Sequence, residues 1–265
     1  MKLAIAVVLA LSGVPADDKQ DLSKAVQKFV GAASYAFKGE TKMDSPLGNL
    51  PQQVPALEGS WEKEMGLRAT LGDRGEFFRQ GDKFFVKQAG GEWQRLEDAQ
   101  APPAEGARPR GGRGFMQRMV RNLKAPHEEV QDVSKGFKAL KKEEKREAVG
   151  EKECTVYGGE LTEEGVKDSP LGKMLGQFGG AANATLSGSA KAWVDGEGNL
   201  LKYEVSNRAS LEFQGNPIEF SLVRTTSLTD VGKARVEVPD GVKKLLEDAP
   251  KEKPKTETPG KDEKK

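Results

Sequence analysis

Residues 201–213 read Leu-Lys-Tyr-Glu-Val-Ser-Asn-Arg-Ala-Ser-Leu-Glu-Phe, and apolar and polar side chains alternate through most of this stretch. A period of two places alternate side chains on opposite faces of a strand, so the stretch predicts a β-strand with one dry and one wet face. Asp195-Gly196-Glu197-Gly198-Asn199 predicts a turn back to a strand at 185–194, and Gly215-Asn216 predicts a turn forward to a strand at 217–228. The sequence therefore predicts a long antiparallel meander near its C-terminal end.

The rest of the chain predicts more strands and a few helices. Strands are expected at 35–43, 56–71, 75–80, 83–88, around Trp93 and within 137–161. Helices are expected at 17–32, at 115–123, from Pro126, at 169–178 and from Asp240 to 246. We expect an α+β fold, in which helices cover the concave face of one curved antiparallel sheet, an incomplete barrel. The side chains expected to be largely buried are Trp61, Trp193, Tyr203, Leu211 and Phe220.

The N-terminal residues predict export. Lys2 precedes an unbroken apolar run from Leu3 to Leu11, and Val14-Pro15-Ala16 offers small residues for cleavage, so 1–16 are expected to be a signal peptide. The run is too short for a span, which needs about 20 residues. No cysteine lies nearby to carry a lipid anchor. We therefore expect a periplasmic or secreted protein with no membrane span after cleavage.

Charge and composition define the domain limits. Cleavage after Ala16 removes Lys2 and no acid, so the formal net charge falls from +1 to zero, which argues against a nucleic-acid partner. Residues 17–246 are expected to form a single domain that contains a flexible loop at 99–114. Residues 247–265, rich in lysine, glutamate and proline, are expected to be a disordered tail.

Signatures of enzymes are missing from the sequence. Cys154, the only cysteine, lies in a strand-like segment and is expected to be a buried, inert residue. His127, the only histidine, follows Pro126 at a helix start, where we expect a solvated residue and not a catalytic base. Phosphate-binding, dinucleotide-binding, zinc-protease and nucleophile-elbow motifs are absent from the sequence. We expect no cofactor, no metal and no enzymatic activity.

One short motif occurs twice. Asp44-Ser45-Pro46-Leu47-Gly48 recurs as Asp168-Ser169-Pro170-Leu171-Gly172. The repeat is consistent with an ancestral duplication or with two matched helical turns at one opening. An efficient helix start that is used twice is slightly favoured, because the offset between the copies changes along the chain.

The order of the patterns resembles a known group of proteins. A helix enters Ser34-Tyr35-Ala36-Phe37-Lys38-Gly39, the hairpin Val194–Lys202 follows the mid-chain helices, and Val236-Glu237-Val238-Pro239 leads into a last helix. This order is similar to that of LolA-like periplasmic lipoprotein carriers and LppX-like mycobacterial lipid-binding lipoproteins. The resemblance implies an incomplete barrel with an apolar cavity under helices, which shuttles or senses acyl chains.

The expected function is therefore that of a non-enzymatic binding protein, which carries acyl chains, lipids or lipidated proteins in the cell envelope. The alternative is an envelope scaffold with a solid core, whose protein partner binds the 99–114 loop or the tail. Methionine fills adaptable apolar space, and short helices open at low cost, so Met119, Met174, Leu175 and Phe178 are expected to line the mouth or lid of a cavity. The full set of residues expected to bind the ligand is Trp61, Phe77, Phe84, Met116, Met119, Met174, Leu175, Phe178, Trp193 and Tyr203.

Overall fold

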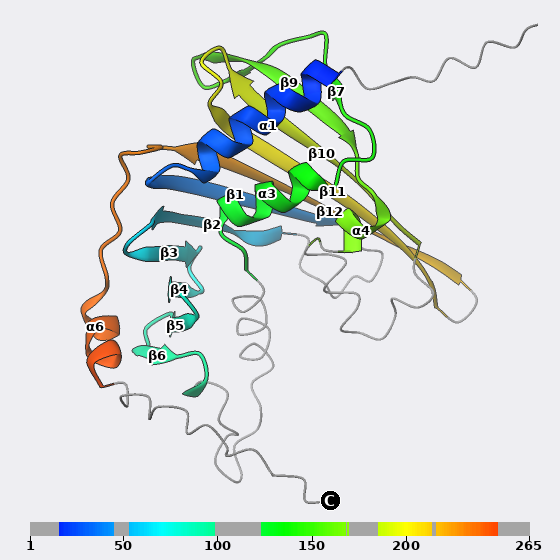
Figure 1. The fold of residues 1–265 in the computed structure, drawn as a ribbon. Coiled ribbons are helices and arrows are strands. Elements are labelled where there is room, and N and C mark those ends of the chain that lie inside the picture. Colours follow the sequence, from blue (N-terminus) through cyan, green and yellow to red (C-terminus); the bar gives the residue numbers. More distant parts are fainter. Residues whose placement is uncertain are drawn as a thin grey trace, which may run out of the picture.

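One large antiparallel sheet dominates the computed structural model, which describes residues 16–44, 53–98, 123–167, 169, 185–213 and 216–248 (Figure 1). Twelve strands form a sheet in the order β6-β5-β4-β3-β2-β1-β12-β11-β10-β9-β7, and β8 pairs with β9. The strands are β1 (Ser34–Asp44), β2 (Gln53–Glu62), β3 (Gly66–Leu71), β4 (Gly75–Gln80), β5 (Lys83–Gln88), β6 (Trp93–Arg95), β7 (Lys141–Lys142), β8 (Glu147–Val149), β9 (Lys152–Glu160), β10 (Thr185–Asp195), β11 (Leu200–Phe213) and β12 (Asn216–Thr229). The prediction of an α+β fold with an open antiparallel sheet is confirmed.

The meander predicted from residues 185–228 is the centre of this sheet. Strand β11 pairs with β10 on one side and with β12 on the other, and Tyr203 lies opposite Ala192 and Thr226. The β10–β11 turn is built on Asp195, whose Oδ1 accepts the backbone N–H groups of Glu197 and Asn199. Burial acts to raise the pKa of Asp195, but hydrogen bonds from Lys152 and Asn199 outweigh it and lower the pKa to about 2.

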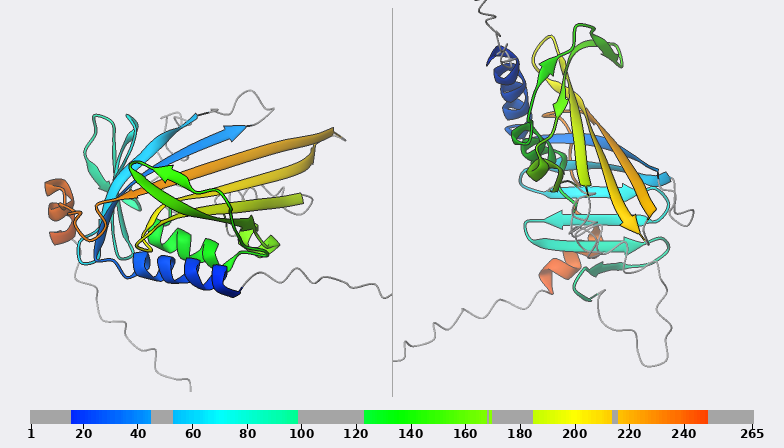
Figure 2. Two further views of the ribbon diagram at one scale, coloured as in Figure 1. Left: turned by 90° about the horizontal axis from the view of Figure 1, so that it is seen from above. Right: turned by 90° about the vertical axis from the view of Figure 1, so that its right-hand side faces the viewer.

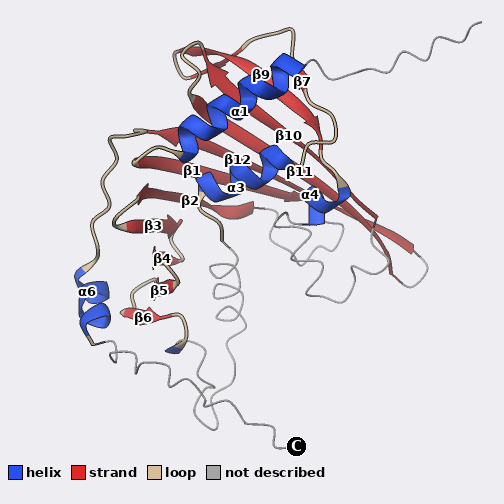
Figure 3. Ribbon diagram, viewed as in Figure 1, coloured by secondary structure: helices blue, strands red, loops and turns tan. Residues whose placement is uncertain are grey.

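Helices cover the concave face of the sheet (Figures 2 and 3). They are α1 (Ala16–Val30), α3 (Pro126–Lys135) and α4 (Glu163–Lys167). Leu22, Val26 and Phe29 of α1 pack into the main core with Tyr35 and Phe37 of β1. The predicted helix at 17–32 is thereby confirmed, since its apolar stripe is the buried face.

The last helix, α6 (Asp240–Glu247), lies at the other end of the sheet, beside β6 (Figure 1). Val242 packs with Phe78, Phe85 and Val236 in a core of its own. Side chains that alternate along β4 and β5 therefore serve two separate cores. Within the described ranges, no helix is long and apolar enough to cross a membrane.

Predictions of burial had mixed outcomes. Trp193, Tyr203 and Phe220 are buried, as expected, and so is Cys154, whose thiol pKa is raised by burial. Trp61 is only partly buried, because it packs against the edge of the main core. The side chain of Leu211 lies outside the described part of the chain.

The single strand predicted at 56–71 is wrong. It is two strands, β2 and β3, that pair with each other around a turn at 63–65. Gly66 has a φ of 102°, and a Cβ there would lie 2.2 Å from the backbone oxygen of Arg79. Gly66 thus permits the turn that divides the predicted strand in two, although the apolar alternation continues past it. The helices predicted at 115–123 and 169–178, the 1–16 signal peptide, the 99–114 loop and the tail lie largely or wholly outside the described residues.

Candidate functional site

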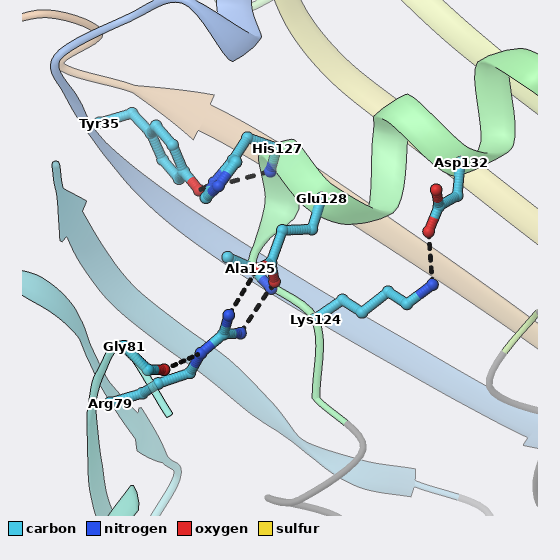
Figure 4. Close-up of polar contacts among 8 residues, drawn as sticks. All are labelled: Tyr35, Arg79, Gly81, Lys124, Ala125, His127, Glu128 and Asp132. Atoms are coloured by element: carbon cyan, nitrogen blue, oxygen red, sulfur yellow. Dashed lines mark hydrogen bonds and ion pairs between the residues drawn. The ribbon is translucent and has the colours of Figure 1, made fainter. Parts of the chain in front are cut away.

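The N-terminus of α3 is held on the sheet by a complete set of polar contacts (Figure 4). Both guanidinium Nη atoms of Arg79 donate to the Glu128 carboxylate, at 2.8 and 2.5 Å, and Arg79 Nε donates to the Gly81 carbonyl at 3.4 Å. The backbone N–H of Ala125 also donates to Glu128, at 2.8 Å. Burial acts to raise the pKa of Glu128, but these hydrogen bonds outweigh it and lower the pKa. We call Arg79, Ala125 and Glu128 the α3 anchor.

His127 belongs to an aromatic cluster beside the α3 anchor. Its Nδ1 lies 2.6 Å from the Tyr35 hydroxyl, and its ring centroid lies 4.4 Å from that of Trp61. Burial lowers the pKa of His127 and raises that of Tyr35. The expectation of a solvated histidine is wrong, because the fold brings β1 and β2 against the start of α3. Contacts of α3 with Tyr35 of β1, Trp61 of β2 and Arg79 of β4 thus fix the position of this helix.

The next residue of α3 points into a buried polar cluster. Glu129 Oε2 accepts the hydroxyl hydrogen of Tyr203 at 2.7 Å, and Glu129 Oε1 lies 3.4 Å from Arg224 Nη1. Burial and the neighbouring Glu129 carboxylate raise the pKa of Tyr203, which therefore remains a hydroxyl donor at neutral pH. We call Glu129, Tyr203, Arg224 and Asn207 the buried polar cluster. Glu129, Tyr203 and Arg224 are 5%, 1% and 9% exposed, and Asn207 is fully buried.

Two members of this cluster lack hydrogen-bond partners within the described part of the chain. They are Arg224, through its Nη2, and Asn207, through both its amide nitrogen and its amide oxygen. Asn207 lies opposite Leu222, and Arg224 is two residues further along β12. Diagonal neighbours of this kind have Cα atoms about 7–8 Å apart, within reach of one small molecule. Native proteins pair most buried polar groups, so these unused donors and acceptors need an explanation.

A glycine gives Asn207 its space. Gly188 lies opposite Asn207 on β10, and a Cβ there would be 2.8 Å from Asn207 Oδ1 and 2.9 Å from Val166 Cγ2. A larger residue at 188 would displace the amide.

The sheet carries a second apolar cluster next to the polar one. Ala209, Phe220 and Leu222 are buried together, with Met43, Leu186 and Ile218 packed around them. This cluster is formed by side chains of β11 and β12, with Met43 of β1 and Leu186 of β10. Along β11 the residues on this face run from Tyr203 and Val205 of the main core, through Asn207, to Ala209. The buried polar cluster therefore interrupts the apolar face of β11, and we call the part beyond it the distal apolar cluster; Leu186 of β10 packs against the apolar residues on both sides.

The residues predicted to bind a ligand are not all brought together. Tyr203 is in the buried polar cluster, Phe77 is in the main core, and Trp61 and Phe84 pack against that core. Trp193 lies in a different cluster, with Cys154 and Val156. Lys202 Nζ lies 4.0 Å from the centroid of the Trp193 ring, and the Trp193 Nε1–H donates to Glu147 at 2.8 Å. Met116, Met119, Met174, Leu175 and Phe178 lie outside the described residues.

The analysis of sequence patterns missed Glu129, Asn207 and Arg224. A signal for two of them was present, because Arg224 occupies the same alternating positions as Leu222 and Leu228, and Asn207 those of Val205 and Ala209. A charged or amide side chain in the apolar phase of a strand is costly unless it has a partner. No pattern in the sequence marks Glu129 as that partner, since α3 reaches Arg224 only through the fold.

The chemistry that these residues offer is hydrogen bonding. Among the residues that the structure describes, no group of three or more His, Cys, Asp and Glu side chains is placed to hold a metal ion. The polar groups that converge here are an ion pair, a phenol and an amide, which can donate and accept hydrogen bonds.

Comparison with known proteins finds likenesses among solved structures alone. No protein family model matches the chain, and no curated protein matches its sequence. Among solved structures, the chain is similar to the lipoprotein LppX from Mycobacterium tuberculosis, with 14% identity over 84% of this chain and 98% of that one and a TM-score of 0.47. LprF from Mycobacterium bovis has 14% identity over 86% and 99% of the two chains, with a TM-score of 0.45. A LolA superfamily protein from Nitrosomonas europaea has 10% identity over 85% and 96%, with a TM-score of 0.31. These proteins include both groups that the sequence resembles.

Proposed function

We propose that this chain is an exported, non-enzymatic binding protein that carries an amphiphile with an acyl chain in the periplasm or outside the cell. One observation carries the proposal: between the main core and the distal apolar cluster, the apolar face of β11 and β12 is interrupted by buried side chains with polar atoms that are unpaired within the described ranges. A solid core gains nothing from such an interruption, because each unpaired buried group costs about 1–3 kcal/mol. A molecule with a polar end and a hydrocarbon chain matches both features.

The first test is direct identification of the cargo. The protein is purified from its native envelope or culture fluid, without detergent, and examined by native mass spectrometry followed by lipid extraction. We expect a co-purifying acyl lipid at close to one molecule per chain. A homogeneous mass equal to the bare polypeptide, together with no displacement of a fluorescent acyl probe, would contradict the proposal and favour the envelope scaffold.

A matched pair of phenylalanines separates a binding surface from a core. Phe220 belongs to the distal apolar cluster and is 8% exposed, whereas Phe37 belongs to the main core and is 4% exposed. We expect Phe37→Ala to cost about 3–5 kcal/mol with acyl affinity unchanged in the folded fraction. Phe220→Ala is expected to lower acyl affinity about tenfold, which corresponds to ~1.4 kcal/mol of lost contact. Equal losses of stability and no change in affinity would mean that Phe220 is ordinary core.

We also propose an entrance for the acyl chain. Met119, Met174, Leu175 and Phe178 are proposed to line it, on the grounds of their one-sided apolar pattern in two short segments next to glycine. The double substitution Leu175→Glu and Phe178→Glu is expected to abolish binding of the acyl probe while thermal unfolding stays cooperative. A double variant that fails to fold would place these residues in the core and end this part of the proposal.

A further inference from the structure

We propose that Arg224 and Asn207 bind the headgroup of the amphiphile, and that this headgroup is uncharged, with at least one carbonyl oxygen and one hydroxyl or amide N–H. The inference rests on the proposed function and adds the chemical class of the ligand. The buried side-chain atoms without partners are gathered mainly on these two residues. Of five buried side-chain nitrogen and oxygen atoms without partners in the described part of the chain, three belong to these two residues.

The unpaired atoms define what the ligand must offer. Arg224 Nη2 and the Asn207 amide nitrogen are donors, and both need an acceptor. The Asn207 amide oxygen is an acceptor and needs a donor. A carboxylate or phosphate offers acceptors alone and would leave that oxygen unpaired. An ester or amide carbonyl with an adjacent hydroxyl or N–H meets all three requirements.

Charge leads to the same conclusion. The guanidinium of Arg224 already faces the carboxylate of Glu129 at 3.4 Å, and both side chains are buried. Tyr203 adds a neutral hydroxyl, because burial raises its pKa. The cluster therefore carries no net charge, and an anionic headgroup would bring a second negative charge close to Glu129. Burying an uncompensated charge is far more costly than burying a hydrogen-bonded neutral group.

The position of the cluster suits this chemistry. The distal apolar cluster begins at Ala209 and Leu222, which are the next residue on the same face of β11 and the residue opposite Asn207. A headgroup at Asn207 thus places an attached acyl chain along apolar side chains. The small residue Gly188 leaves the Asn207 amide free of a neighbouring side chain on β10. Acyl glycerols and the N-acylated ends of lipidated peptides share the required groups.

The experiment compares headgroups at constant chain length. Palmitate, 1-monopalmitoylglycerol and N-palmitoylglycinamide each compete with a fluorescent acyl probe on the full mature chain at pH 8. We expect both neutral ligands to bind at least tenfold more tightly than palmitate. The ratio between the ester and the amide then identifies the better source, a glycerolipid or an acylated peptide.

Two variants connect this preference to the cluster. Asn207→Leu removes the unpaired amide at almost constant size, and is expected to reduce the preference for neutral ligands to less than threefold. Glu129→Gln combined with Arg224→Met removes the ion pair and is expected to have the same effect. Ser206→Val is the matched control, since Ser206 is the adjacent residue on the opposite face of β11, and it should leave the preference unchanged.

The outcomes are distinguishable. Palmitate binding as tightly as the neutral ligands, or a preference that survives both variants, would overturn the headgroup assignment and leave the carrier function standing. Failure of every palmitoyl ligand to displace the probe from the wild-type chain would overturn the proposed function, and the headgroup assignment with it. Circular dichroism of each folded variant accompanies these measurements.

Discussion

Two neighbouring glutamates of α3 are paired with arginines of the sheet in very different ways. Arg79 uses both Nη atoms on Glu128, and an additional N–H from Ala125 completes that carboxylate. Arg224 approaches Glu129 through one Nη atom at 3.4 Å, and its other Nη atom has no partner within the described residues. In the first pair, every guanidinium nitrogen of the arginine makes a hydrogen bond. In the second pair, Arg224 Nη2 is left without a partner within the described residues. The contrast shows that the α3 anchor holds the helix, and it is the basis for our proposal that the buried polar cluster binds a ligand.

Among the substitutions that test this contrast, the largest expected effect comes from breaking the α3 anchor. Arg79→Ala leaves Glu128 partly buried without its main partner and should lower the free energy of unfolding by about 2 kcal/mol. Urea unfolding followed by circular dichroism measures this loss. Arg74→Ala is the control, since Arg74 is exposed and should change stability by less than ~0.5 kcal/mol. Equal effects of the two substitutions would show that the anchor contributes nothing specific.

The next largest loss of stability is expected when the space around Asn207 is filled. Gly188→Ala forces a methyl group against Asn207 and Val166, and should cost about 1–2 kcal/mol. Gly196→Ala is the matched control, because a Cβ at 196 has nothing within 4 Å. Thermal unfolding of both variants, and of Gly188→Ala combined with Asn207→Ala, provides the measurement. A cost that does not shrink in the double variant would mean that the amide is not the obstacle.

Removal of the Asn207 amide is expected to stabilise the protein, in contrast to the two substitutions above. Asn207→Leu should raise the free energy of unfolding of the ligand-free chain by about 1 kcal/mol, since it deletes buried polar atoms without partners. Asn199→Leu provides the contrast, because the Asn199 amide donates to Asp195 at 2.9 Å and its loss should destabilise by about 1 kcal/mol. Denaturant unfolding after delipidation tests both. Destabilisation of similar size at the two positions would mean that Asn207 is a structural residue.

The smallest effect is one of pH on the aromatic cluster beside the α3 anchor. The folded pKa of His127 is below its ordinary value of 6.5 because the ring is partly buried. The unfolded chain therefore binds a proton first, so His127 contributes stability above about pH 6.5 that is lost as pH falls through the folded pKa. His127→Asn keeps an acceptor near the Nδ1 position and does not titrate. Calorimetry between pH 8 and pH 5 should show a decline in melting temperature that is shallower in the variant, and parallel curves would contradict this assignment.

The predictions that succeeded concern short-range order. Alternation along 201–213, the turn at Asp195 and the stripe of α1 are each determined by residues within a few positions of one another, so the pattern is visible in the sequence. The strand predicted across 56–71 was wrong because the turn within it depends on a contact outside the segment. Alternation continued past Gly66, and the turn there depends on a close approach to Arg79, a residue of another strand.

The candidate site illustrates the limit of such reasoning. Alternation puts Tyr203 and Asn207 on one face of β11, because the period of a strand is local. The register that brings Arg224 of β12 to the same face is visible only in the structure. Whether a buried polar side chain finds a hydrogen-bond partner depends on the segments that pack against it. Glu129 lies 95 residues before Arg224 in the sequence, and Gly188 lies opposite Asn207 on another strand. By itself the sequence determined the antiparallel sheet, the covering helices and the apolar phase of each strand. Only the tertiary structure decided that His127 is packed against aromatic rings, that each guanidinium nitrogen of Arg79 is paired and that Arg224 Nη2 has no partner among the described residues, since pairing is a property of distances between distant segments.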